Sequence, residues 1–162
     1  MRVNLVKADL KKKDVLRKML LAYQREIKRE KQPEEYKYLD NYWKKNNHFP
    51  FFITVNDEIA GFILVNDFCI VEKGSKSVSE FFVKEEYRHQ EIGRQAAKMT
   101  FDLFPGKWEI RQLANNFKAQ AFWKAIIKDY TDNNFKEILL DNKKWHGPMQ
   151  IFDNSKLARS TL

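Results

Sequence analysis

The stretch SVSEFFVKEEYRHQEIGRQAAKMTFDLF, residues 77–104, determines the fold that we expect for this chain. Residues 77–83 alternate small or polar with apolar or aromatic side chains, a period that predicts a strand. Residues 84–90 are polar and charged, which indicates a short loop. Residues 91–104 have apolar positions at helical spacing and predict an amphipathic helix. Its apolar face consists of Ile92, Ala96, Met99 and Leu103.

A strand, a short polar loop and a helix in this order form a candidate anion site. The amides of the first helical turn have no intrahelical acceptor, and they point with their partial positive charge at the loop. Arg88 and Arg94 add full charge, and Gly93 has no Cβ, so the helix can approach a ligand or a neighbouring strand closely. A diphosphate suits such a place. An ordinary strand–helix connection is the alternative that these residues leave open.

Residues 81–94 resemble the acetyl-CoA-binding segment of the GNAT family of N-acetyltransferases, whose pattern runs V-x-x-x-Y-R-x-x-G-x-G or A. The residues that match it in type and spacing are Val83, Tyr87, Arg88, Ile92 and Gly93. Glu91 stands where the pattern has its first glycine. A carboxylate beside a diphosphate is repulsive, so we expect either weaker cofactor binding or a Glu91 side chain that turns away.

Residues 116–123 resemble the family's later pattern N-x-x-A-x-x-F-Y, with Asn116, Ala119 and Phe122 in place and Trp123 instead of the final tyrosine. In many members that tyrosine is taken as the general acid for the leaving thiolate. An indole N–H donates a hydrogen bond but does not give up its proton at accessible pH. The acid role therefore does not carry over to Trp123, and Tyr87, Tyr130 or water are the substitutes.

The resemblance covers roughly residues 2–152 and implies an α/β fold, with a mixed, mostly antiparallel central sheet flanked by helices. It also implies transfer of an acetyl group from acetyl-CoA, without a metal, to a primary amine of a small molecule or of a protein or peptide. The cofactor-binding residues that we expect are Phe82, Val83, Arg88, His89, Gln90, Glu91, Ile92, Gly93, Arg94, Asn116, Phe122 and Trp123. For Asn116, a helix N-cap is an equal alternative.

Acetyl transfer to an amine needs a polarised carbonyl and a deprotonated nucleophile. By analogy with the family, a backbone N–H near Phe82 and Val83 is the expected oxyanion donor. Glu80 is the candidate general base, because a carboxylate in an otherwise apolar strand is unusual; the alternative is an ion pair with a cation such as Arg111. Tyr130 is the candidate acid.

The family's acceptor lies beneath the first two helices and the following hairpin, which here points to aromatic residues. Our candidates for substrate binding are Tyr36, Tyr42 and Trp43, with Tyr38 and Phe49 nearby. Aromatic rings suit an amine-bearing cation or an apolar group. Ordinary packing accounts for most of these rings equally well.

Composition sets broader bounds on the chain. Its 162 residues suit a single domain, which we place at residues 1–155, followed by a C-terminal tail at 156–162. Cys69 is the only cysteine, which argues against a disulfide framework and favours a reducing, cytoplasmic setting. We expect no signal peptide and no membrane span. His48, His89 and His146 lie far apart without metal-ligand spacing, so we expect no metal site.

The chain is basic, with 30 Lys and Arg against 22 Asp and Glu and a formal charge of +8. Such a charge attracts polyanions, but the lysines are mixed with acidic residues, as on a solvated surface. We therefore expect a monomer or homodimer without a nucleic-acid or membrane partner. Two other functions stay open: a CoA-binding domain with little or no catalysis, suggested by Glu91 and Trp123, and an acetyltransferase whose acceptor amine is carried on RNA, suggested by the charge alone.

Periodicity and turn signals divide the rest of the chain into elements. Helices are expected from residue 10 to 27 after Asp9, over 34–45 after Pro33, and from Asn115 or Asn116 to residue 130. A loop is expected at 46–50 and a tight turn at Asn56 and Asp57. Strands are expected at residues 2–7, 51–55, 59–65, 68–71, 107–113, 135–140 and 147–152.

Overall fold

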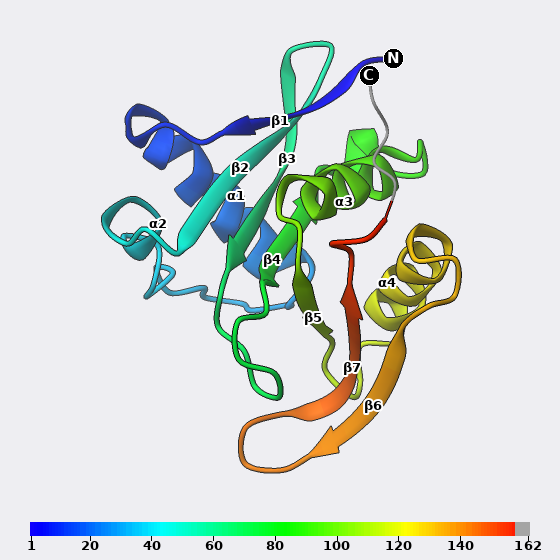
Figure 1. The fold of residues 1–162 in the computed structure, drawn as a ribbon. Coiled ribbons are helices and arrows are strands. Elements are labelled where there is room, and N and C mark those ends of the chain that lie inside the picture. Colours follow the sequence, from blue (N-terminus) through cyan, green and yellow to red (C-terminus); the bar gives the residue numbers. More distant parts are fainter. Residues whose placement is uncertain (158–162) are drawn as a thin grey trace. The chain divides into compact units, whose positions relative to one another are not determined.

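The computed structural model describes residues 1–157 and is drawn in Figure 1. The chain divides into two compact units, the first formed by Met1–Asn66 and Ser79–Ala96, the second by Asp67–Val78 and the chain from Ala97 onward. The single domain at residues 1–155 stays a prediction. Of the tail expected at 156–162, residues 158–162 lie outside the described part.

The first unit is built on a sheet with the strand order β1-β2-β3-β4. These strands are β1 (Val3–Lys7), β2 (His48–Val55), β3 (Glu58–Asn66) and β4 (Ser77–Val83), of which the residues from Ser79 onward belong to this unit. The pairs β1–β2 and β2–β3 are antiparallel. The turn predicted between β2 and β3 is confirmed: Asn56 and Asp57 have φ of 49° and 71°, the left-handed values that a two-residue hairpin turn requires.

One long helix, α1 (Lys13–Glu26), covers a face of this sheet (Figure 1). It follows a 3-10 turn (Leu10–Lys12), whose N-cap is Asp9. The helix is amphipathic, and its buried residues pack against aromatic side chains of β2, β3 and β4. This core includes Leu16, Met19, Leu20, Phe52, Phe62 and Phe82.

The second unit contains a separate antiparallel sheet with the order β5-β7-β6. Its strands are β5 (Lys107–Arg111), β6 (Lys136–Asp141) and β7 (His146–Asp153). Helix α4 (Phe117–Tyr130) belongs to this unit, as does α3 (Ile92–Leu103) from Ala97 onward. The core is centred on Phe101, whose ring lies 5.0 Å from those of Trp108 and Phe152 and 5.1 Å from that of Tyr130.

The predicted helix at 34–45 is wrong over most of its length, because only α2 (Asn41–Lys44) is α-helical. The residues before α2 form turns instead, such as the one closed by the hydrogen bond from the Leu39 amide to the Tyr36 carbonyl at 3.1 Å. The Tyr36 hydroxyl is engaged by Ser79 and Glu80, a tertiary interaction that local helix preference does not include. The loop predicted at 46–50 is also shorter, since β2 already begins at His48, opposite Asn66.

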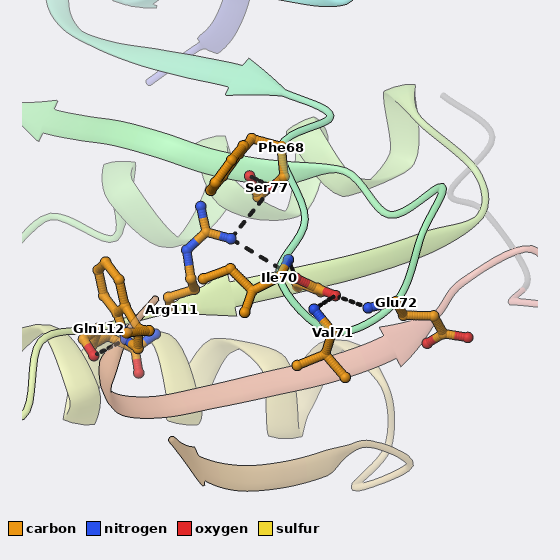
Figure 2. A network of polar contacts seen from close by, with 9 residues as sticks. Phe68, Ile70, Val71, Glu72, Ser77, Arg111 and Gln112 are labelled. Carbon is orange, nitrogen blue, oxygen red and sulfur yellow. Dashed lines mark hydrogen bonds and ion pairs between the residues drawn. The ribbon is translucent and has the colours of Figure 1, made fainter. Parts of the chain in front are cut away.

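The strand predicted at 68–71 is wrong as well: this segment is a loop held by one buried carboxylate (Figure 2). Glu109 on β5 is fully buried and accepts hydrogen bonds from the amides of Ile70 at 2.8 Å and Val71 at 3.0 Å, and from the amide of Glu72. A strand would use these amides in a ladder. Here a side chain from a distant part of the sequence accepts them instead.

We expect Glu109→Gln to lower the free energy of unfolding by about 3 kcal/mol. The glutamine side chain has an NH2 group in place of one carboxylate oxygen, so a buried acceptor is lost and the NH2 group faces the backbone N–H donors of the loop. Urea unfolding measures this loss. Asp141→Asn is the control, since the Asp141 side chain is 86% exposed, and it should change stability little. A loss below about 1 kcal/mol for Glu109→Gln would contradict the anchoring role.

Candidate functional site

The end of β4 is held closely against β3 in the first unit. A Cβ on Gly61 of β3 would lie 2.1 Å from the Phe82 carbonyl oxygen, so only glycine permits this approach. The Lys84 amide donates to the Ala60 carbonyl at 2.8 Å, directly after the strand. The backbone around Phe82 and Val83, where we expect the oxyanion donor, is therefore placed by main-chain packing.

The loop between β4 and α3 contains a short 3-10 turn (Glu85–Tyr87) and two left-handed residues. His89 has φ of 59° and Glu91 has φ of 64°. Left-handed residues are typical of turns whose N–H groups converge on an anion. The value at Glu91 explains why the family pattern has glycine there, because glycine adopts this φ without steric cost. The Gln95 amide donates to the Glu91 carbonyl at 3.0 Å, so helical hydrogen bonding starts from Glu91.

The Glu91 side chain turns away into solvent, where it is 71% exposed and its carboxylate lies 3.7 Å from Nε of Arg94. Weaker cofactor binding, the other outcome expected for this residue, stays a prediction. Gln90 and Gly93 flank the same turn of the chain, and the Gln90 side chain donates to the Glu86 carbonyl at 3.0 Å.

Arg88 is placed differently from the expectation that it faces a diphosphate. Its Nε donates to the Val83 carbonyl at 2.8 Å, its Nη1 forms an ion pair with Glu26, and its guanidinium lies 5.5 Å from the centre of the Phe82 ring. These contacts attach the end of β4 to the end of α1. Arg94 lies on the first turn of α3, whereas Arg88 lies in the loop before this helix.

We expect Glu91→Gly to tighten acetyl-CoA binding, because it removes a negative charge from the loop, and to raise the free energy of unfolding by about 1 kcal/mol, because it removes a left-handed non-glycine residue. Isothermal titration and urea unfolding measure the two effects. Glu86→Gln, in the same loop without a left-handed φ, is the control for charge alone. Looser binding in Glu91→Gly would show that the Glu91 side chain supports the loop.

A second group of polar side chains surrounds Glu80, which lies on β4 and is only 9% exposed. Lys28, just beyond α1, places its Nζ 3.3 Å from Oε1 of Glu80. Tyr23 and Tyr36 are both close enough to this carboxylate to interact with it electrostatically. Burial raises the pKa of each tyrosine far above its usual value, and the negative charge of Glu80 raises both pKa values further. The ion pair expected as the alternative role of Glu80 is therefore present, with Lys28 as the partner. Arg111 is not that partner; its guanidinium donates to the Phe68 carbonyl at 3.3 Å within the second unit (Figure 2).

The other two predicted acceptor residues have their own structural partners in the first unit. Tyr42 is 3% exposed, and its hydroxyl bonds to Oγ of Ser79 and accepts from Nδ2 of Asn66 at 3.3 Å. Burial raises the pKa of Tyr42. Trp43 donates its indole N–H to the Ala8 carbonyl at 2.9 Å. Tyr36 is therefore the predicted acceptor residue that reaches Glu80, while Tyr42 and Trp43 hold the surrounding structure.

The predicted site residues of the second unit have structural partners there. Asn116 is the N-cap of α4 and accepts from the Ala119 amide at 3.1 Å, as its N-cap alternative predicts. Trp123 is 7% exposed and meets the Phe122 ring edge-on at 5.2 Å. The Tyr130 hydroxyl donates to Asp102 at 2.8 Å and accepts from Asn154 at 3.1 Å. Their cofactor and acid roles stay predictions.

A family model described as the acetyltransferase (GNAT) family matches residues 15–126, more than half of the chain and including both the β4–α3 loop and Glu80. The chain belongs to the GNAT acetyltransferase family. Among solved structures, it is similar to an acetyltransferase from Thermus thermophilus, with a TM-score of 0.70 and 15% identity over 94% of this chain and 97% of that one. No curated protein sequence matches it.

Two further solved structures resemble this GNAT chain. The ribosomal-protein-S18-alanine N-acetyltransferase from Escherichia coli has a TM-score of 0.66 and 13% identity over 99% of both chains. The spermidine N-acetyltransferase from Vibrio cholerae, solved with CoA and spermine, has a TM-score of 0.64 and 13% identity over 95% of this chain and 96% of that one. At these identities the likeness shows the fold, and it confirms the predicted α/β class with its mostly antiparallel sheet.

Sequence reasoning on this GNAT chain did not include two residues of the Glu80 cluster, Tyr23 and Lys28. Tyr23 lies within the first predicted helix and Lys28 directly follows it, and neither is a candidate site residue in the sequence analysis. A tyrosine hydroxyl on a buried helix face needs a partner, and that requirement is the signal by which a polar cluster could have been predicted. Which partner it finds depends on the tertiary fold.

Two general features complete the description of residues 1–157. No group of histidine, cysteine, aspartate and glutamate side chains in this range is arranged to hold a metal ion. No helix within it combines the length and the apolar character that crossing a membrane requires.

Proposed function

We propose that this GNAT chain is an N-acetyltransferase that transfers an acetyl group from acetyl-CoA to a primary amine of a small molecule or of a protein or peptide. The observation that carries the proposal is Glu80, a buried carboxylate on β4 that faces two tyrosine hydroxyls and already holds a primary ammonium, that of Lys28, at 3.3 Å. A site that seats an ammonium on a buried carboxylate suits an amine acceptor.

The residues at the start of α3 fit a phosphorylated carrier. The amides of the first helical turn and of the loop with left-handed His89 and Glu91 offer donors, and Arg94 adds positive charge. In the proposal, His89, Gln90, Ile92, Gly93 and Arg94 hold the diphosphate, and acetyl-CoA supplies the activated acetyl group when bound. Arg88 acts indirectly, by holding the strand end to Glu26.

In the reaction, Glu80 accepts a proton from the acceptor ammonium, so that the amine nitrogen can form the amide bond as the carbon–sulfur bond breaks. The two tyrosines interact with the carboxylate electrostatically and keep it in a largely buried setting. A backbone N–H at Phe82 or Val83 stabilises the developing oxyanion. The thiolate takes its proton from water or Tyr87, and a CoA thiol is acidic enough to leave as thiolate without a dedicated acid.

Two further observations support this function over a binding domain without catalysis. The Glu91 side chain is 71% exposed, so solvent screens its charge. The structural neighbours include enzymes whose names specify amine acceptors, spermidine in one and the alanine of ribosomal protein S18 in the other. We propose a cytoplasmic location, in keeping with a single, unpaired cysteine.

The test is to incubate the chain with acetyl-CoA and pooled primary amines, and to measure release of the CoA thiol and the masses of the products. We expect thiol release that requires both substrates. Binding of acetyl-CoA without release on any acceptor would instead favour a CoA-binding domain. A steep loss of acceptor binding with salt would point to an amine carried on RNA.

A further inference from the structure

Lys28 is held in place by the end of α1. The Ile27 amide donates to the Tyr23 carbonyl at 2.8 Å, and the Glu30 amide donates back to the Gln24 carbonyl at 2.9 Å. Between them, Arg29 has φ of 56°, the left-handed residue that commonly ends a helix. The backbone on both sides of Lys28 is thus hydrogen-bonded to the last turn of α1. These bonds fix the point from which the Lys28 side chain extends.

The Lys28 ammonium occupies the place that an acceptor amine needs. It lies 3.3 Å from Oε1 of Glu80 and 5.4 Å from the centre of the Tyr23 ring, so that a carboxylate and an aromatic face both contact it. Other lysines of the chain pair at the surface: Lys98 pairs with Asp129 and Lys124 with Glu137, whose carboxylates are 49% and 34% exposed. The Glu80 carboxylate is 9% exposed.

Lys28 also remains accessible, because its side chain is 39% exposed while its ammonium rests on the buried carboxylate. Along β4, Glu80 and Phe82 point to the same face of the strand, about 7 Å apart. The proposed base therefore lies two or three residues before the backbone N–H groups of Phe82 and Val83, one of which is the proposed oxyanion donor, with Lys28 already on the base.

We propose that Lys28 is itself an acceptor: the chain acetylates its own Lys28 within one molecule. The inference rests on the proposed function, from which it takes acetyl-CoA as the co-reactant. Glu80 accepts a proton from the Lys28 ammonium, the nitrogen forms an amide bond with the acetyl carbonyl carbon, and the carbon–sulfur bond breaks. The nitrogen loses two protons in all: the first passes through Glu80 to solvent, and the second, released as the amide forms, goes to the leaving thiolate. The products are Nε-acetyl-Lys28, CoA and one proton.

Acetylation of Lys28 has a direct consequence for the site. An acetylated lysine has no positive charge, so it no longer forms the ion pair with Glu80. Before the modification, an external amine competes for the carboxylate with the Lys28 ammonium, which has a high local concentration because it is part of the same chain. After the modification, the carboxylate is available to the external amine. The modified chain is accordingly the form that binds an external acceptor better.

The experiment uses the full chain with acetyl-CoA and no added amine, followed by peptide mapping by mass spectrometry over time. We expect one acetyl group on Lys28, formed at a rate per molecule that does not change on dilution of the protein. Lys44, whose side chain is 75% exposed, reports the uncatalysed background. Glu80→Gln is expected to slow acetylation of Lys28 by about 100-fold, to near that background, and to leave Lys44 unchanged.

Lys28→Arg keeps the positive charge beside Glu80 but has no primary amine that can be acetylated. It is therefore the control that separates loss of the acceptor from loss of the ion pair. It should give no modified peptide and should raise the KM of an external amine relative to chain acetylated at Lys28. Modification of Lys28 no faster than that of Lys44, or a rate per molecule that rises with protein concentration, would overturn the proposal. If Lys28 stays unmodified while an external amine is acetylated, only this inference fails; if acetyl-CoA does not bind at all, the proposed function fails with it.

Discussion

Replacing Glu80 by glutamine is expected to lower kcat/KM for acetylation of an external amine by about 10²- to 10³-fold. Glutamine keeps the size of the side chain and can accept hydrogen bonds from Tyr23 and Tyr36, but it does not accept the proton of the acceptor. The loss should be greatest at low pH, where more of the acceptor amine is protonated and depends on a base. Thiol release measured over a range of pH gives the result.

Glu80 is buried against Lys28, so a change in folding must be separated from a change in chemistry in this variant. Urea unfolding of the variant and its acetyl-CoA affinity, measured by titration, provide that separation. Glu58→Gln, an exposed glutamate on β3 in the same unit, is the matched control and should retain full activity. An unchanged pH–rate profile for Glu80→Gln would remove Glu80 as the base.

Replacing Gly61 by alanine is expected to destabilise the first unit by about 3 kcal/mol or more and to abolish acetyl transfer. The new Cβ would lie 2.1 Å from the Phe82 carbonyl oxygen and 3.1 Å from Cα of Val83, and both are backbone atoms. A flexible side chain could move aside, but a strand backbone moves only by disturbing its hydrogen bonds. That movement displaces the amides on which the proposed oxyanion site depends.

Gly74→Ala separates this clash from the general effect of losing a glycine. Gly74 has φ of 91°, and a Cβ there meets no atom within 4 Å. We therefore expect only the cost of a left-handed alanine, about 1–2 kcal/mol, with activity retained. Unfolding by urea and thiol release compare the two variants. Equal losses in both would show that β3 and β4 have room to separate at Gly61.

Local patterns were sufficient where neighbouring residues supply the whole interaction. The alternation of residues 77–83 and the spacing of Ile92 and Ala96 depend on the strand and helix periods, and both elements form where predicted. Of the predicted apolar face of the helix, Ile92 and Ala96 are buried, but Met99 is half-buried and Leu103, in the last turn of α3, is 52% exposed. The turn at Asn56 and Asp57 needs only residues that tolerate a left-handed φ. Asn116 caps α4 with its own side chain.

Predictions from local patterns failed where a side chain that is distant in sequence interacts with the backbone amides or with the tyrosine hydroxyl of the segment. Residues 68–71 alternate like a strand, but the Glu109 carboxylate binds the amides of Ile70 and Val71 and keeps the segment as a loop. Tyr36 lies in a sequence that favours helix, but its hydroxyl is drawn to Glu80 and Ser79. Neither partner is close in sequence to the segment it contacts, so the periodicity of that segment does not reveal the contact.

The sequence by itself determined the fold class, the position of the strand–loop–helix and the identity of Glu80 as the unusual carboxylate, because each follows from residue type and spacing along one segment. Only the tertiary structure decided that Lys28 and the tyrosine hydroxyls surround Glu80, that Arg88 is bound to Glu26, and that Glu91 turns into solvent. The physical reason is that periodicity reports which face of an element is buried, whereas the partner of a buried charge is chosen by whichever elements the fold brings against that face.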